Sequence, residues 1–239
     1  MLSCSPTRQH SSSSCTLLGS GLSLKDRRGV ITVKVKARKR IPSTKRCRKG
    51  TFAALDFFRR KIATSGAVDD ILAVVSDTNR GCSTSGSQRA SIDAAIGTLE
   101  GAGNDASLFN KGLSATWKLL WTTEKETLFI IRNANLFQTT AGEVYQIIDT
   151  DKATLQNVIV FPPKGAFVIE TKIEQSGDQR VKFEFEKAVL KLPKRDIKLP
   201  PYGKGWFDNV YLDSRIRVSK DIRGNVLITA RDGPPRSVI

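Results

Sequence analysis

The sequence predicts a mainly β fold of the α+β class, in which an antiparallel β-barrel of about eight strands follows an N-terminal helical extension. Short runs of alternating apolar and polar residues recur between residues 113 and 231, with polar turn residues between them. The stretch before them has apolar residues at helical spacing. With 239 residues and 39% hydrophobic content, the chain can bury one sizeable core.

Residues 1–50 have the composition of a chloroplast transit peptide followed by a basic disordered segment. They hold 13 Lys and Arg against one acid, Asp26, while the rest of the chain holds 26 basic and 22 acidic residues. Ser11 to Ser14 form a run, and no continuous apolar segment of the secretory type is present. Processing is expected near Ala37, and a basic tail that is never removed is the alternative. Because most of the net charge of +16 belongs to this leader, the charge is weak evidence for a nucleic-acid partner, and none is expected.

Residues 51–105 are predicted to form the helical extension. Helices are expected over 52–61 and 68–77, separated by Ser65-Gly66, and a third is expected over 88–100. The apolar stripes of these helices could face a membrane or a partner. Packing against the barrel is favoured, because the polar faces carry both signs of charge.

Residues 106–233 are predicted to form the barrel, with turns at 149–151, at Pro162-Pro163, at 176–178 and at Arg223-Gly224-Asn225. The proline-containing segment 192–202 is expected to be an irregular loop over one barrel mouth. Such a sheet must close on itself or be covered, and eight strands enclose either a filled core or one small ligand; the sequence leaves both open. The eight strand-like runs are 113–122, 126–131, 143–149, 154–161, 165–173, 180–190, 214–220 and 225–231.

Three motifs occur in a fixed order along the chain: LSATWKLLWTT from Leu113, GEVYQIID from Gly142, and GWFDNVYLDSRIRVSKDIRGN from Gly205. Together they resemble the pattern of the plastid lipid-associated protein (PAP) or fibrillin family, over residues 52–231. The resemblance implies a lipocalin-like barrel, a chloroplast or other plastid location at plastoglobules or thylakoids, and association with lipid.

The residue types present argue against an enzyme. The only histidine is His10, in the leader, so the predicted folded part has no imidazole for acid–base catalysis or metal binding. Cys82 is the one cysteine beyond the leader, and a zinc site is therefore not expected. No cofactor or metal is predicted. Carboxylate chemistry at Asp149 or Asp213 is kept as a third hypothesis.

Aromatic side chains are the candidate lipid-binding residues, because pockets for fatty or isoprenoid chains are mostly apolar. Trp117 and Trp121 are two apart in an alternating run, with Leu120 as its exception, so we expect them on one face of a strand. A packed aromatic core is the alternative for each residue. The candidates for a barrel lining are Trp117, Trp121, Phe129, Tyr145, Phe161, Phe167, Phe183 and Phe185.

The family resemblance also implies a structural closure of the barrel. Trp117 would pack against Arg217, or else Arg223, as a cation–π plug, with Ala115 where the usual Gly-x-Trp pattern has glycine. Asp213 and Asp221 match acids of the family's closing motif, and capping of turns is their plainer role.

The predicted function is non-enzymatic binding or shielding of carotenoids, prenylquinones or acyl lipids at plastoglobule or thylakoid surfaces. Contact with the membrane or lipid droplet would be peripheral, because no apolar run approaches 18 residues. The alternative is a filled barrel that acts as a protein-interaction scaffold and stabilises a plastid enzyme of isoprenoid or quinone metabolism.

Overall fold

The chain divides into two units, Met1–Cys47 and Arg48–Ile239. The computed structural model describes residues 49–102, 112–137 and 139–239, all within the second unit. The predicted transit peptide, with His10 and the processing site, lies outside the described residues, as does most of the predicted junction at 101–105.

Two helices precede the sheet, α1 (Lys49–Val75) and α2 (Gly86–Ala102). The first is continuous through Ser65-Gly66, where the sequence predicted a break. A glycine inside a helix costs only about 1 kcal/mol relative to alanine. Val68 and Ile71 follow directly and are fully buried, so their packing outweighs that cost.

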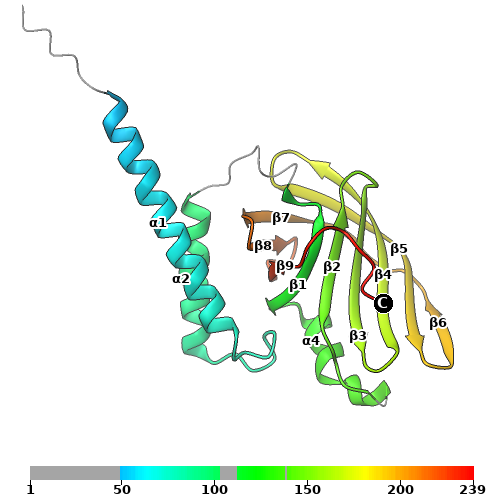
Figure 1. Cartoon of the computed structure of the whole chain (residues 1–239). Coiled ribbons are helices and arrows are strands. Elements are labelled where there is room, and N and C mark those ends of the chain that lie inside the picture. The colour runs from blue at the N-terminus through cyan, green and yellow to red at the C-terminus, as the bar shows by residue number, and fades with distance from the viewer. Residues whose placement is uncertain (1–48, 103–111, 138) are drawn as a thin grey trace, which may run out of the picture. The chain divides into compact units, whose positions relative to one another are not determined.

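Eight strands close a ring in the order β1-β2-β3-β4-β5-β7-β8-β9, and every neighbouring pair is antiparallel (Figure 1). The predicted eight-stranded antiparallel barrel with a helical extension is therefore confirmed. A ninth strand, β6, pairs only with the C-terminal half of β5. The strands are β1 (Ala115–Thr122), β2 (Val144–Asp149), β3 (Thr154–Phe161), β4 (Gly165–Ser176), β5 (Arg180–Leu192), β6 (Arg195–Leu199), β7 (Lys204–Leu212), β8 (Ile216–Asp221) and β9 (Val226–Arg231).

The membership of the ring differs from the prediction in two places. The run predicted as a strand over 126–131 is a helix, α4 (Lys125–Arg132), which continues into a short 3-10 turn, η1 (Ala134–Phe137). Leu128 and Ile131, three residues apart, are its buried side chains, a spacing that suits a helix rather than a strand. Its place in the ring is taken by β7, and the segment predicted as an irregular loop contains β6.

The predicted turns lie between strands as expected. Gly177 links β4 to β5 with φ of 84°, and Gly224 links β8 to β9 with φ of 77°, both in the left-handed region. At the second turn, Asp221 accepts backbone hydrogen bonds from Arg223 (2.8 Å) and Asn225 (2.8 Å) through Oδ1. This turn shapes one side of the barrel mouth described below.

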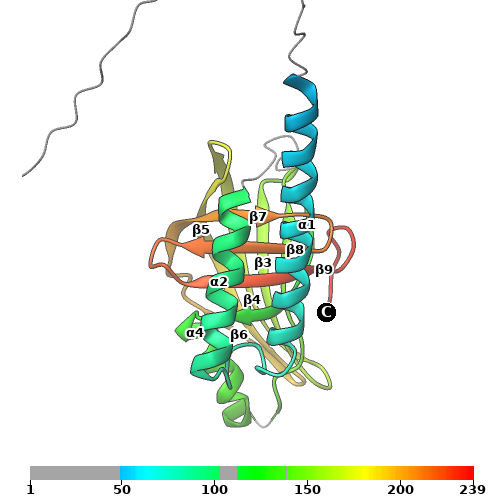
Figure 2. The same cartoon turned by 90° about the vertical axis from the view of Figure 1, so that its left-hand side faces the viewer.

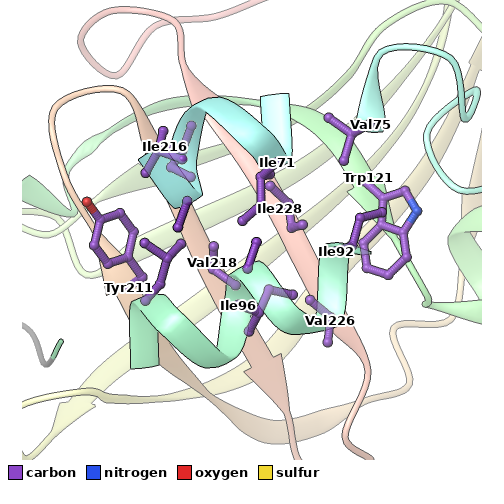
Figure 3. Packing of buried hydrophobic residues seen from close by; sticks show 14 residues of the cluster. Ile71, Val75, Ile92, Ile96, Trp121, Tyr211, Ile216, Val218, Val226 and Ile228 are labelled. Atoms are coloured by element: carbon purple, nitrogen blue, oxygen red, sulfur yellow. The ribbon is translucent and has the colours of Figure 1, made fainter. Parts of the chain in front are cut away.

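The helix pair α1–α2 packs on the outer face of β8 and β9, as the helical stripes predicted (Figures 2 and 3). We call this contact the outer cluster. Arg215 and Asp69 form an ion pair of 2.6 Å beside it, and Lys220 pairs with Glu100. Its fully or nearly fully buried members include Val68, Ile71, Val75, Ile92, Ile96, Leu99, Trp121, Ile216, Val218, Val226 and Ile228.

Candidate binding cavity

The barrel encloses a cavity of about 600 Å³. This volume is within the range of small-ligand pockets, roughly 300–1,000 Å³. Strands on both sides of the ring contribute alternate residues to its wall, as the period of two requires. Apolar wall residues include Leu119, Ile159, Phe167, Ile169, Phe183, Phe185 and Leu227.

A buried tryptophan closes one end of the barrel. Trp117 is 0% exposed, and its Nε1 donates a hydrogen bond to the Leu113 carbonyl (2.9 Å). The guanidinium carbons of Arg217 and Arg231 lie 5.4 Å and 4.4 Å from its ring centroid. These distances are those of cation–π contacts. Trp117 thus lies in the closed end, between two arginines of the last strands.

The other end of the cavity is open between α4, the β6–β7 link and the β8–β9 turn. Tyr202 and Ile222 line the cavity and are nevertheless 83% and 54% exposed, which places them at its rim. Across the mouth, Arg223 pairs with Glu126 of α4 at 2.6 Å. Gly203 passes so close to Phe185 that a Cβ there would lie 2.7 Å from the ring, so only glycine fits at this point of the rim.

Polar side chains gather at the inner part of the cavity wall. Gln146, Asn157, Thr171 and Ser219 line it from β2, β3, β4 and β8, and we call them the polar floor. The Gln146 amide nitrogen donates to Asn157 Oδ1 at 2.9 Å. Thr171 is 2% exposed, and within the described residues its Oγ1 has no hydrogen-bond partner.

Arg217 lies directly behind the polar floor and is 0% exposed. Its Nε and Nη1 contact Thr229 Oγ1 (3.5 Å) and Asn209 Oδ1 (3.3 Å), and its Nη2 donates to Gln146 Oε1. All three acceptors are neutral. Burial lowers the pKa of Arg217 to about 9, because the charged form loses its hydration.

Glu124 is an acid on the cavity wall, at the start of α4. Its Oε2 accepts a hydrogen bond from Thr127 Oγ1 at 2.9 Å. Burial is the largest effect and raises its pKa. The Thr127 hydrogen bond comes second and lowers it, while the charges of Asp221 and Glu126 raise it and that of Arg223 lowers it. The cavity therefore has one buried cation at its floor and one poorly hydrated acid on its wall.

Four of the predicted lining residues border the cavity, namely three phenylalanines and Tyr145. Phe167, Phe183 and Phe185 lie on its wall, and the Phe183 and Phe185 rings stack with centroids 5.4 Å apart. Phe161 is buried in the neighbouring cluster with Ile131 of α4. Phe161 and Trp117, which is at the closed end, are interior as well, but they do not line the cavity.

Two other candidates, Trp121 and Phe129, do not line the cavity. A β-bulge between Leu119 and Trp121 shifts the register against β9, so Leu119 lines the cavity and Trp121 joins the outer cluster. Figure 3 shows Trp121 beside Val75 and Ile92 of this cluster. Its Nε1 donates to Thr84 Oγ1 at 2.9 Å. Phe129 is on α4 and 61% exposed. Tyr145 borders the cavity, but it packs with Ile147 and its neighbours in a separate cluster.

The two predicted closure acids cap turns. Asp213 Oδ1 accepts backbone hydrogen bonds from Arg215 and Ile216, both at 2.7 Å, and its Oδ2 accepts from the Tyr211 hydroxyl at 3.1 Å. Asp221 holds the β8–β9 turn, as described above. Of the two arginines considered for Trp117, Arg217 is beside it, while Arg223 pairs with Glu126 at the mouth.

The polar floor is the part of the site that sequence reasoning missed. A signal was present, because Asn157 lies between Leu155 and Ile159, and all three share one face of β3. Thr171 stands in the same relation to Ile169 on β4. A polar residue within an otherwise apolar face of a strand indicates a polar site inside the barrel, which a prediction based on aromatic residues does not include.

A second hollow, of about 730 Å³, lies on the outside of the barrel. It is lined by the end of α1, the α1–α2 link and the outward side chains of β1 to β3, among them Leu72, Arg80 and Lys118. This outer groove shares Leu119 of β1 and Tyr145 of β2 with the lining of the barrel cavity. Arg80 closes one side of the groove by donating to the Gly142 carbonyl. Within the described residues, no cluster of His, Cys, Asp and Glu could hold a metal ion.

An eight-stranded antiparallel ring around one small, mostly apolar cavity defines a lipocalin-like barrel. The PAP_fibrillin family model matches residues 66–230, and the chain belongs to this family, as the three motifs predicted. A probable plastid-lipid-associated protein 11 of Arabidopsis thaliana, named as chloroplastic, is 49% identical over 163 residues, 67% of this chain and 77% of that protein.

More distant relatives extend the same family. Plastid-lipid-associated protein 6 of Arabidopsis thaliana is 25% identical over 66% of this chain and 67% of its own length. A light-induced protein of Solanum tuberosum is 24% identical over 66% of this chain and 64% of its own length. Both are named as chloroplastic, and neither name states an enzymatic activity. No solved structure matches the chain.

Proposed function

We propose that this protein is a non-enzymatic, lipid-associated protein of plastids that holds one acyl or prenyl chain inside its barrel. The observation that carries the proposal is the cavity of about 600 Å³, open at one end and walled by Phe167, Phe183 and Phe185. The names of the relatives, plastid-lipid-associated and chloroplastic, support both the ligand class and the compartment. Residues 1–50 would then act as the transit peptide.

Contact with a lipid surface is proposed at the barrel mouth. The exposed Tyr202 and Ile222 form the rim, and Lys204 and Arg223 lie beside them on the cavity wall. Apolar side chains can enter the head-group region while cations meet anionic lipids, at about 1 kcal/mol for each basic residue near the surface. None of the described helices is long and apolar enough to cross a bilayer. The surface would be that of a plastoglobule or thylakoid.

Native mass spectrometry of the protein purified from plastids, combined with extraction of its lipids, tests the carrier function. We expect one isoprenoid or acyl lipid per chain. The variant Ile169→Trp should lose the lipid because the indole fills the cavity, while Val160→Trp, on the opposite face of the sheet, serves as the matched control. A protein that is reproducibly empty, in wild type and control alike, would contradict the proposal.

Flotation with vesicles of plastid galactolipids and phosphatidylglycerol tests the surface contact. The double variant Tyr202→Ser, Ile222→Ser should float several-fold less than wild type, because the rim loses its apolar side chains. Ile62→Ser is the control, since Ile62 is 72% exposed but belongs to α1 and does not line the cavity. Equal loss in both variants would show that the mouth has no special part in the contact.

The scaffold hypothesis keeps one specific observation in its favour, the outer groove beside α1 and β1 to β3. A partner enzyme bound there would leave the barrel cavity unaffected. Lys118→Glu in the outer groove should then release the partner during purification from plastids, whereas Phe167→Ala should lower lipid affinity only if the cavity is the functional site.

A further inference from the structure

The cavity is amphipathic, with its polar part at the inner end. Apolar rings line the way in from the mouth, and Gln146, Asn157, Thr171 and Ser219 form the polar floor near the closed end. Gln146 and Asn157 already bond each other, but a purely hydrocarbon ligand would leave the buried Thr171 hydroxyl without a partner among the described residues. Burying an unbonded hydroxyl or amide is unfavourable by roughly 1–3 kcal/mol on mutational scales. The arrangement suits a ligand that has a polar head and an apolar tail.

Thr171 indicates where that head would lie. Its Oγ1 is buried and has no hydrogen-bond partner within the described residues, although Thr171 lines the cavity. Buried hydroxyls are almost always hydrogen-bonded in native proteins. An acceptor atom of a bound ligand, beside Asn157 and Thr171, would satisfy this hydroxyl.

Arg217 indicates the charge of the head. Its guanidinium is fully buried, and its hydrogen-bond acceptors Gln146, Asn209 and Thr229 are neutral. Among the residues described by the structure, no carboxylate lies within ion-pair distance of this guanidinium, while other arginines at the surface, such as Arg215 and Arg180, have such partners. The charge of Glu124 on the cavity wall favours the protonated guanidinium only from beyond ion-pair distance, so an anion placed directly beside this buried cation would add stabilisation.

From these observations we infer that the cavity takes a long-chain carboxylate with its head inward, the carboxylate at Asn157, Thr171 and Gln146 above Arg217 and the tail toward Tyr202. This inference rests on the proposed function and names the ligand class and its orientation. The opposite orientation would place the carboxylate between Lys204 and Arg223 at the mouth, where both cations are exposed to water and Arg223 already pairs with Glu126. The inner cation gains more from an anion, because it is shielded from water.

The orientation is tested by NMR with palmitate labelled with ¹³C at either its carboxyl or its methyl end, bound to the full chain. A water-soluble paramagnetic agent broadens the signals of nuclei close to the solvent. We expect the methyl signal to broaden strongly and the carboxyl signal to stay sharp. The reverse result would overturn the inference and leave the proposed function standing.

Affinity measurements by calorimetry test the residues. Thr171→Val should weaken palmitate binding roughly threefold to tenfold, as for the loss of one hydrogen bond to a charged group, and Arg217→Gln should weaken it more than tenfold. Binding of 1-hexadecanol, the matched neutral chain, should change less than threefold in both. Lys204→Gln at the mouth tests the opposite orientation and should weaken palmitate binding less than Arg217→Gln does. Lys182→Gln is the control and should leave palmitate affinity within twofold, because Lys182 is exposed on β5 and does not line the cavity. If Arg217→Gln fails to fold, Thr171→Val and Asn157→Leu carry the test.

The remaining outcomes separate the two proposals. If the wild type binds a short-chain plastoquinone but not palmitate, the carboxylate inference is wrong and the lipid-binding function stands. If Thr171→Val and Arg217→Gln both bind palmitate as wild type does, the head is not at the polar floor. If neither palmitate, hexadecanol nor the quinone binds, both proposals fail together.

Discussion

The two faces of β8 lie in opposite surroundings. Ile216 and Val218 point outward into the outer cluster, where they meet apolar residues of α1 and α2 and are 0% exposed. Arg217 and Ser219 point inward, one beneath the polar floor and one in it. The largest apolar cluster of this protein therefore lies on the outside of the barrel, whereas the inside combines two smaller apolar clusters with the polar floor and an open volume.

This difference assigns stability to the outer cluster and ligand binding to the barrel interior. The outer cluster buries aliphatic side chains between the helix pair and the sheet, so it can stabilise the unit that contains both. The interior is then free to hold polar groups and an open volume, which a single core could not tolerate without loss of stability. The predictions below test whether the two regions have these separate roles.

The largest effect is expected at Trp121, the biggest side chain of the outer cluster. Trp121→Ala should lower the free energy of unfolding by about 3–5 kcal/mol, because it leaves a large cavity between β1 and the helix pair. Lipid affinity should change little, since Trp121 does not line the barrel cavity. Urea unfolding and lipid binding on the same variant check both statements. Loss of lipid binding in a variant that still unfolds like wild type would contradict the separation of the two regions.

Two neighbouring residues of β9 provide a matched pair, because their side chains point to opposite faces of the strand. Ile228 is 0% exposed in the outer cluster, whereas Leu227 is half-buried and lines the cavity. Ile228→Ala should reduce stability by about 2–5 kcal/mol, and Leu227→Ala by less than about 1.5 kcal/mol, because its side chain already borders an open space. Comparison of their urea midpoints, with unchanged m values, measures the difference. Equal losses would show that the interior is packed as tightly as the outer cluster.

The next prediction concerns the pH dependence that Glu124 confers on stability. Its pKa is raised above the ordinary value of 4.5, mainly by burial, so the folded state binds more protons than the unfolded state above pH 4.5. Glu124 therefore contributes to the wild-type free energy of unfolding below pH 4.5, and this contribution is lost as the pH rises through the raised pKa. Glu124→Gln cannot titrate, so relative to wild type it should gain stability between pH 4.5 and pH 7.5. Urea unfolding at both pH values checks the sign, and a difference that stays constant or reverses would contradict it.

The smallest effect is expected at the exposed ion pair between Arg215 and Asp69, which links β8 to α1 beside the outer cluster. Both side chains are about half exposed, at 43% and 60%. Asp69→Asn should lower stability by less than about 1 kcal/mol, and the loss should shrink further in 1 M salt. Thermal unfolding at low and high salt measures it. A larger, salt-independent loss would mean that this pair, rather than apolar packing, holds the helices on the barrel.

Much of the fold follows from local patterns. The alternation of β3, β4 and β5 and the turn residues Gly177 and Gly224 predicted strand positions and links correctly. The strand predicted over 126–131 was wrong. A run of six residues is too short for its apolar pattern to separate strand from helix, and only the burial of Leu128 and Ile131, three residues apart, shows the helical spacing. For the site, Phe167, Phe183 and Phe185 were predicted at the cavity wall and lie there, whereas the β-bulge that turns Trp121 outward leaves no clear mark in the sequence.

The sequence by itself determined the eight-stranded class, the family and the composition of each strand face. The tertiary structure decided which face is inside. Alternation with a period of two defines the two faces of a strand. Burial of the apolar face inside the barrel and burial under a helix both remove that face from water, so the pattern does not distinguish them. In β8 the helix pair covers the apolar face, so Arg217 is turned inward, and the interior holds a cavity whose polar floor has a buried cation behind it.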